Sequence, residues 1–195
     1  MEKYIYKQLS FKPEDFFPGD IGLVRGRGGN IFEKFIRFGI RKFTNGVCNH
    51  AFIMSSKGKV IEATTSGVVK TSLKKYINNK DGILMFRYKN IKPHQLSLIM
   101  AAAEGRLGRR YDFKSVIAFL LRSLFHIEQK DDVYANFCSE LIVESYAVAG
   151  IKTSDKPAYK TSPADLRRYF FKHKRAWKLI DWQNIGQTLA DQIFS

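Results

Sequence analysis

The 195-residue chain is poor in cysteine and has no long apolar run. Its two cysteines, Cys48 and Cys138, make no disulfide framework, so nothing demands an oxidising compartment and a free thiol is the simpler interpretation. The longest apolar run, Val116 to Leu121, is far shorter than the roughly 20 residues that span a bilayer. The first residues carry scattered charges and no apolar core of signal-peptide length. We therefore expect a soluble protein without a transmembrane segment, cytoplasmic by default, with export left open.

Acidic side chains are also scarce, because 18 Asp and Glu face 33 Lys and Arg, which gives a formal net charge of +15. Such an excess favours anionic surroundings, including acidic lipid headgroups, cell-wall polymers and nucleic acid, without choosing among them. The basic residues cluster in Lys34 to Lys42, Arg106 to Arg110 and Arg167 to Lys178. No repeat or nucleic-acid motif organises these clusters. A plain solvated surface is as good an interpretation as an anion-binding face.

Hydrophobic residues make up 45% of the chain, enough to fill the core of one domain of this length. Apolar periodicity and turn residues predict the elements along it. Strands are expected over Ile21 to Arg25, Asn49 to Met54, Val60 to Thr64, Ile83 to Tyr88 and Trp177 to Asp181. Helices are expected over Asn30 to Phe43, Pro93 to Leu107 and Ser115 to Ile127, at Cys138, from Ser162, and over Gln183 to Ser195.

The stretch from Asn136 to Ser145 carries the strongest chemical signal. Apolar residues at helical spacing follow Cys138, and Gly150 is placed to close the helix, so Cys138 falls in the first turn. The amides and the dipole at a helix start favour an anion, which promotes the thiolate form of a cysteine. Cys138 is therefore a candidate nucleophile. The alternative is a small buried hydrophobe that begins a core helix.

Two strands supply polar partners for a nucleophile. His50, Phe52 and Met54 share one face of the first strand, while Glu62 shares a face of the next strand with its neighbours at two-residue spacing. With an odd connection or a bulge, His50 and Glu62 would lie diagonally on one face; with an even turn they would face opposite ways. The sequence permits both registers. In the first register we expect both side chains to face the Cys138 helix.

Together these residues match what thiol-based acyl transfer requires. Cys138 would attack, His50 would take and return the proton, and Glu62 would orient the imidazole. The backbone amide of Cys138 is the candidate oxyanion donor. A zinc site that adds Cys48 to these three residues is the weaker alternative, because no Cys-x-x-Cys motif is present. We expect no metal and no cofactor.

Five motifs in this order resemble the circularly permuted NlpC-type papain-like superfamily, specifically its YiiX-like branch. They are Gly19-Asp20-Ile21, Asn49-His50-Ala51, Val60-Ile61-Glu62-Ala63, Gly108-Arg109-Arg110-Tyr111-Asp112-Phe113 and Phe137-Cys138-Ser139-Glu140-Leu141. The histidine precedes the cysteine here, the reverse of papain. The resemblance covers about residues 18–170 of a single domain over 1–195, with a C-terminal strand and helix over 171–195.

The resemblance implies an α+β fold in which an antiparallel sheet packs against a central cysteine-bearing helix with additional helices. It assigns Cys138 as nucleophile, His50 as base and Glu62 as the orienting residue. It also suggests that Tyr111 and Asn49 contact substrate, although Asn49 stands where many relatives carry Ser. The implied activity is a cysteine peptidase or amidase.

Two alternatives to that activity stay open. One is an acyl hydrolase or acyltransferase that acts on lipid esters or thioesters, and the other is a non-catalytic binding module with a basic surface. The expected partners are accordingly a peptide-like, amide or acyl substrate. An anionic surface or lipid headgroup is a further candidate, and nucleic acid is not excluded.

Overall fold

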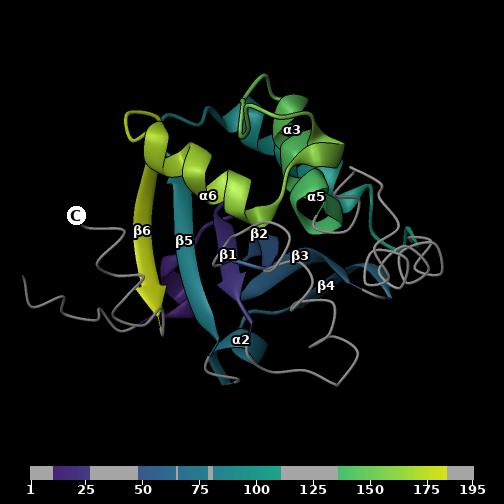
Figure 1. The fold of residues 1–195 in the computed structure, drawn as a ribbon. Helices are drawn as coiled ribbons and strands as arrows, with labels where there is room; N and C mark the ends of the chain where they lie inside the picture. The colour runs from purple at the N-terminus through teal and green to yellow at the C-terminus, as the bar shows by residue number, and fades with distance from the viewer. Residues whose placement is uncertain (1–10, 27–47, 65, 79–80, 111–135, 184–195) are drawn as a thin grey trace, which may run out of the picture.

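The computed structural model describes residues 11–26, 48–64, 66–78, 81–110 and 136–183. Its six strands form one antiparallel sheet in the order β4-β3-β2-β1-β5-β6 (Figure 1). The strands are β1 (Ile21–Arg25), β2 (His50–Ser56), β3 (Lys59–Thr64), β4 (Gly67–Ser72), β5 (Gly82–Tyr88) and β6 (Trp177–Gln183). The helices are α2 (Lys74–Asn78), α3 (Pro93–Glu104), α5 (Asn136–Ala147) and α6 (Pro163–Lys172), with short 3-10 turns at η1 (Pro13–Asp15) and η2 (Ala158–Lys160).

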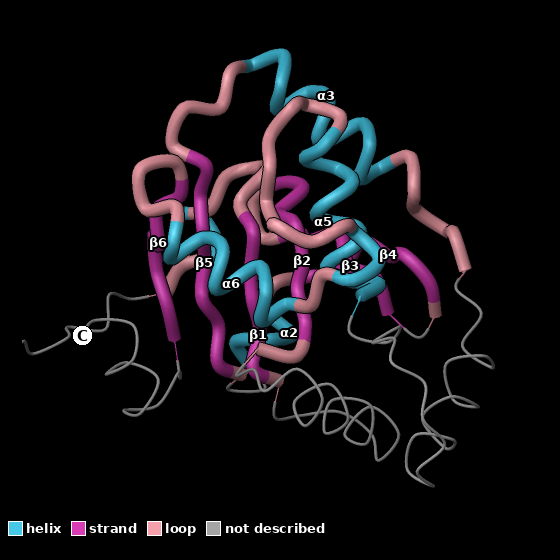
Figure 2. The backbone as a smooth tube through the Cα atoms, turned by 45° about the horizontal axis from the view of Figure 1, so that its top comes forward, coloured by secondary structure: helices cyan, strands magenta, loops and turns pink. Residues whose placement is uncertain are grey.

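The sheet separates two apolar layers. Helices α3, α5 and α6 lie together over one face, and α2 lies at the opposite side, as the two views of the backbone show (Figures 1 and 2). Ala51 and Ile53 of β2 pack on the helix side, whereas Phe52 and Met54 pack on the α2 side. Because both faces of the sheet are covered, the central strand has apolar residues at consecutive positions rather than only at alternate ones.

The hairpin of β2 and β3 contains a bulge. Ile53 pairs with Ile61 and Met54 with Val60, but the register shifts between Met54 and Ser56. A bulge inserts one extra residue and bends the strand. The structure thus has the register that sets His50 and Glu62 on the same face of the sheet.

Gly22 is required by close packing between β1 and β2. It pairs with Phe52, and a Cβ atom at this position would lie 2.0 Å from the Phe52 ring. The ring therefore occupies the space that any other residue at position 22 would fill. On its other side, Phe52 stacks on Tyr76 of α2 with ring centroids 5.2 Å apart.

The turn before β1 is held to the sheet by an ion pair between the buried Asp20 and the partly exposed Arg87. Arg87 of β5 donates from Nε to Asp20 Oδ1 at 2.7 Å and from a terminal nitrogen to Oδ2 at 2.6 Å. Asp20 is 1% exposed, and its Oδ2 also accepts from the Phe17 backbone at 2.8 Å. Tyr146 of α5 donates to the Gly19 carbonyl. These bonds connect the Gly19-Asp20 turn to both β5 and α5.

The expected α+β fold, with a sheet packed against a cysteine-bearing helix, is confirmed. The expected strands are all present, and α6 begins as predicted, with Ser162 accepting from the backbone of Asp165 in a capping box. Sequence periodicity did not predict β4 or α2. The expected helices over 30–43 and 115–127, and the tail after Gln183, lie outside the described residues.

Candidate active site

Cys138 is the third residue of α5 and is 6% exposed. Helix α5 packs on β2 and β3 and also contacts α3 and α6. The neighbouring Ser139 anchors the first turn of the helix, because its hydroxyl donates to the Thr161 carbonyl in the loop before α6. The cysteine therefore lies at a fixed helix start that faces the sheet, as the sequence pattern predicts.

His50 is the first residue of β2, and its side chain is 16% exposed. Its Nε2 lies 2.8 Å from Glu62 Oε2, and the ring also makes a side-chain hydrogen bond with Cys138. Burial alone would lower the pKa of His50, but the hydrogen bonds and negative charges of Cys138 and Glu62 raise it to about 9.

Glu62 of β3 is 1% exposed and is surrounded by donors. Besides His50 on Oε2, the carboxylate accepts from Tyr76 on Oε2 and from Thr71 and Lys75 on Oε1. Burial favours the neutral acid, yet the hydrogen bonds and charges of His50 and Lys75 lower the pKa of Glu62 well below its usual range. Glu62 is therefore a carboxylate whose oxygens are engaged from three directions.

Glu62 lies on a different layer from the one that the sequence led us to expect. We expected both to face the Cys138 helix, but Glu62 lies on the opposite layer, because its neighbours Ile61 and Ala63 occupy the α5 side and its donors come from α2 and β4. His50 reaches Cys138 from the first position of β2. The imidazole thus connects the two layers.

The other candidate residues are placed differently. Asn49 is buried, with its amide oxygen accepting from the Gly26 backbone at 3.0 Å, so its side chain joins the start of β2 to the end of β1. Its role in substrate binding stays a prediction. Tyr111 lies outside the described residues.

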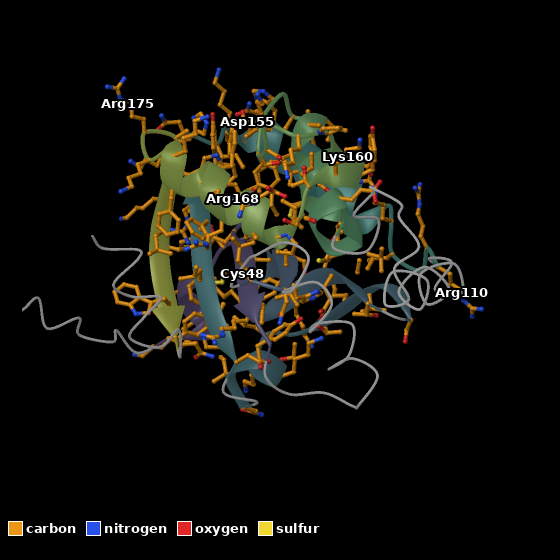
Figure 3. The ribbon with its side chains drawn as sticks, in the orientation of Figure 1. Cys48, Arg110, Asp155, Lys160, Arg168 and Arg175 are labelled. Carbon is orange, nitrogen blue, oxygen red and sulfur yellow. The ribbon has the colours of Figure 1, made fainter. Side chains whose placement is uncertain are left out.

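Cys48, the fourth member of the zinc alternative, is 1% exposed, and burial raises the pKa of its thiol to about 12. Figure 3 shows it inside the molecule, beneath α6. Within the described part of the chain, no three His, Cys, Asp or Glu side chains are grouped so that they could hold a metal ion.

Sequence reasoning missed Thr71, Lys75 and Tyr76. The available signal was Glu62 itself, because a carboxylate within the apolar run Val60 to Ala63 needs donors when the strand is buried. Val69 pairs with Glu62, so Thr71 is its diagonal neighbour on the same face of β4. The contribution of α2 depends on the path of the chain after β4, which periodicity did not reveal.

Cys138 lies at a helix start and is hydrogen-bonded to His50, which is in turn held by the buried carboxylate of Glu62. Thiol-dependent acyl-transfer enzymes use such an arrangement. The sequence model of one family matches residues 18–166, and its description is a permuted papain-like amidase enzyme, YaeF/YiiX, C92 family. The chain belongs to this family of papain-like amidases and peptidases. The resemblance found from the five motifs is confirmed.

Two Escherichia coli proteins are similar to this chain. "Probable lipoprotein peptidase YaeF" of strain K12 is 25% identical over 178 residues, which cover 78% of this chain and 63% of that protein. The chain thus spans less than two thirds of the length of this curated relative. The crystal structure of the metalloprotein YiiX of strain O157:H7 matches with a TM-score of 0.49 and 23% identity, over 71% of this chain and 69% of that one.

Proposed function

We propose that this protein is a cysteine-dependent hydrolase that cleaves peptide or amide bonds through an acyl-thioester on Cys138. The observation that carries the proposal is the imidazole of His50, hydrogen-bonded to Cys138 on one side and to Glu62 on the other. In this arrangement His50 is the acid and base, and Glu62 is the positioning residue. Membership of an amidase family supports the bond type.

The raised pKa of His50 favours a protonated imidazole at neutral pH. In the proposed starting state this imidazolium lies beside Cys138, which would react as the thiolate. The thiolate would attack the substrate carbonyl and form a carbon–sulfur bond. The imidazolium would then protonate the leaving amine as the carbon–nitrogen bond breaks. The neutral imidazole would next take a proton from water, and the resulting hydroxide would attack the thioester carbonyl and form a carbon–oxygen bond. The carbon–sulfur bond would then break, which releases the carboxylic acid and restores the Cys138 thiolate beside the imidazolium. The Cys138 backbone N–H, in the first turn of α5, would donate to the oxyanion.

A peptide-like substrate is the one that the family description supports, and no comparison supports lipid headgroups or nucleic acid as partners. For location, the name of the YaeF relative favours a membrane-associated or exported protein over the cytoplasmic location expected by default. No helix among the described residues is both long and apolar enough to cross a bilayer.

The test is a hydrolysis screen with the wild type, Cys138→Ala and, as a matched control, Cys48→Ala. Peptide amides, acyl thioesters and phospholipids are offered in parallel, and the acyl-enzyme is trapped by acid quench and detected by mass spectrometry. We expect amide turnover that falls at least roughly 1,000-fold in Cys138→Ala, because the covalent route is lost. Cys48→Ala should stay active, since that thiol is buried and neutral.

Two results would overturn the proposal. Amide turnover that survives in Cys138→Ala would remove the covalent mechanism. Turnover of thioesters or lipids without amides would retain the nucleophile but assign the protein to acyl-ester chemistry. A thiol-reactive probe that labels Cys138 at neutral pH, but not after His50→Ala, would support the activated pair independently of any substrate.

A further inference from the structure

We propose that Lys75 shares the Glu62 carboxylate with His50 and thereby limits how firmly His50 holds its proton. Lys75 would be a positioning residue that acts through Glu62, without contact with the reacting atoms. The inference rests on the proposed function, because it concerns the acid and base of that reaction.

The geometry places two cations on one buried anion. His50 engages Oε2 of Glu62 at 2.8 Å, and the Lys75 ammonium engages Oε1. Lys75 is held there by α2, with its nitrogen also 4.7 Å from the centre of the Tyr76 ring. Its side chain is 39% exposed, against 1% for Glu62. The lysine therefore covers the solvent side of a carboxylate that is otherwise enclosed.

The charged groups around the imidazole come from four elements in the described structure. Glu62 of β3 is an anion, and His50 of β2 and Lys75 of α2 are cations. Cys138 of α5 adds a second anion in the thiolate state of the proposed mechanism. With a thiolate and an imidazolium, two negative and two positive charges balance. Thr71 of β4 and the Tyr76 hydroxyl add neutral donors to Glu62.

This balance has a consequence for catalysis. Without Lys75, the imidazolium would face two anions alone and would release its proton only at higher pH. A general acid and base works best when its pKa lies near the working pH, because the group must both give and regain a proton. A second cation on Glu62 weakens the hold of the carboxylate on His50 while the carboxylate stays ionised. Lys75 thus serves the reaction by weakening the electrostatic attraction of Glu62 for the proton on His50.

The test compares Lys75→Met and Lys75→Gln, which lose the charge, with Lys75→Arg, which keeps it. Lys70→Met is the matched control, since Lys70 is a surface lysine whose partner is Glu104 at 3.0 Å. The protonation midpoint of His50 is followed by NMR of histidine-labelled protein and assigned with His50→Gln. The alkaline limb of kcat/KM is measured in parallel.

We expect the midpoint to rise by about 0.5 to 1 pH unit in Lys75→Met and Lys75→Gln, because a nearby positive charge is removed. Lys75→Arg and Lys70→Met should titrate as the wild type does. A midpoint that is unchanged or lower in both uncharged variants would overturn the inference and leave Lys75 a structural clamp. The wild type could also turn over no substrate while the His50 midpoint still rises in Lys75→Met and Lys75→Gln. That result would support the coupling between Lys75 and His50 and contradict the proposed function.

Discussion

At the residue scale, the site depends on the electrostatics of one histidine. The pKa of His50 is raised to about 9 in the folded state, whereas an unperturbed histidine titrates near 6.5. A raised folded-state pKa stabilises the fold fully below about pH 6.5, and this contribution is lost as the pH rises through about 9. Glu62 acts in the opposite sense. Its lowered pKa stabilises the fold above about pH 4.5, and that contribution is lost on acidification.

The first prediction concerns the alkaline limb of activity. Because the leaving amine takes its proton from the His50 imidazolium, kcat/KM should fall as the pH rises through about 9. Glu62→Gln removes one of the two charges that raise this pKa, so the limb should move down by about 1 pH unit or more. The measurement is a pH–rate profile of both proteins.

Glu104→Gln is the control for that profile, because Glu104 is exposed and pairs only on the surface with Lys70. Its limb should coincide with that of the wild type. A Glu62→Gln profile that keeps its alkaline limb while kcat falls would show that Glu62 positions the ring without setting its protonation.

At the element scale, Glu62 is held in place by a row of packed side chains on the α2 side of the sheet. Gly22 leaves room for Phe52, Phe52 stacks on Tyr76, and the Tyr76 hydroxyl donates to Glu62. The five-residue helix α2 is too short to be stable by itself, so these contacts fix its position. The position of the carboxylate therefore depends on packing between β1 and β2.

The second prediction follows from this stack. Gly22→Ala should destabilise the fold by about 2 kcal/mol, because the new methyl overlaps the Phe52 ring and forces it to move. Amide turnover should fall as well, since Tyr76 moves with the ring. Urea denaturation and activity are measured on the same preparation. Adding Phe52→Leu should restore part of the stability and part of the turnover, because the smaller side chain leaves room for the new methyl. A double variant as impaired as Gly22→Ala would contradict the role of the Phe52 ring in positioning Tyr76 and Glu62.

The third prediction concerns the turn that precedes β1. Arg87→Met leaves Asp20, which is 1% exposed, without its charged partner. We expect a loss of about 3 kcal/mol, because an isolated buried carboxylate is costly. Chemical denaturation measures the loss. The double variant Asp20→Asn/Arg87→Met should recover much of it, since the amide is uncharged and can still accept from Phe17. Equal stability of the single and double variants would show that the ion pair is not what holds the turn.

At the scale of the whole molecule, the chain carries a formal net charge of +15. Figure 3 shows Arg175 and Arg110 projecting outward at opposite sides of the molecule. Several described basic residues have acidic partners, as in the pairs of Lys156 and Arg168 with Asp165. Of the three basic clusters predicted from the sequence, the one over 34–42 lies outside the described residues. We expect this excess of positive charge to attract anionic ligands over distances longer than a direct contact.

The fourth prediction tests this attraction. Attraction between exposed charges is screened over about 10 Å at 0.1 M salt, so a cationic protein should attract an acidic substrate mainly at low ionic strength. We expect kcat/KM for an acidic peptide amide to fall roughly threefold to tenfold between about 0.05 and 0.5 M salt. A neutral peptide of the same length is the control and should change little. Equal salt dependence of the two peptides would sink the idea that the basic surface recruits substrate.

The sequence by itself determined the local features of this protein. Apolar periodicity after Asn136 placed Cys138 in the first turn of a helix, and Ser162 with Asp165 marked the start of α6, because both signals lie within one or two helical turns. The five motifs were enough to indicate the family. Cys138, His50 and Glu62 could be named as candidates because their residue types suit one chemistry.

Only the tertiary structure decided how these residues meet. The bulge between Met54 and Ser56 selects the register, and a shift of one residue would have turned Glu62 to the other face of the sheet. The donors of Glu62 come from β4 and α2, whose positions are set by strand pairing and by the Phe52–Tyr76 stack. The physical reason is that burial of a carboxylate requires partners from several elements at once, and the proximity of those elements arises only when the sheet and both of its layers have assembled.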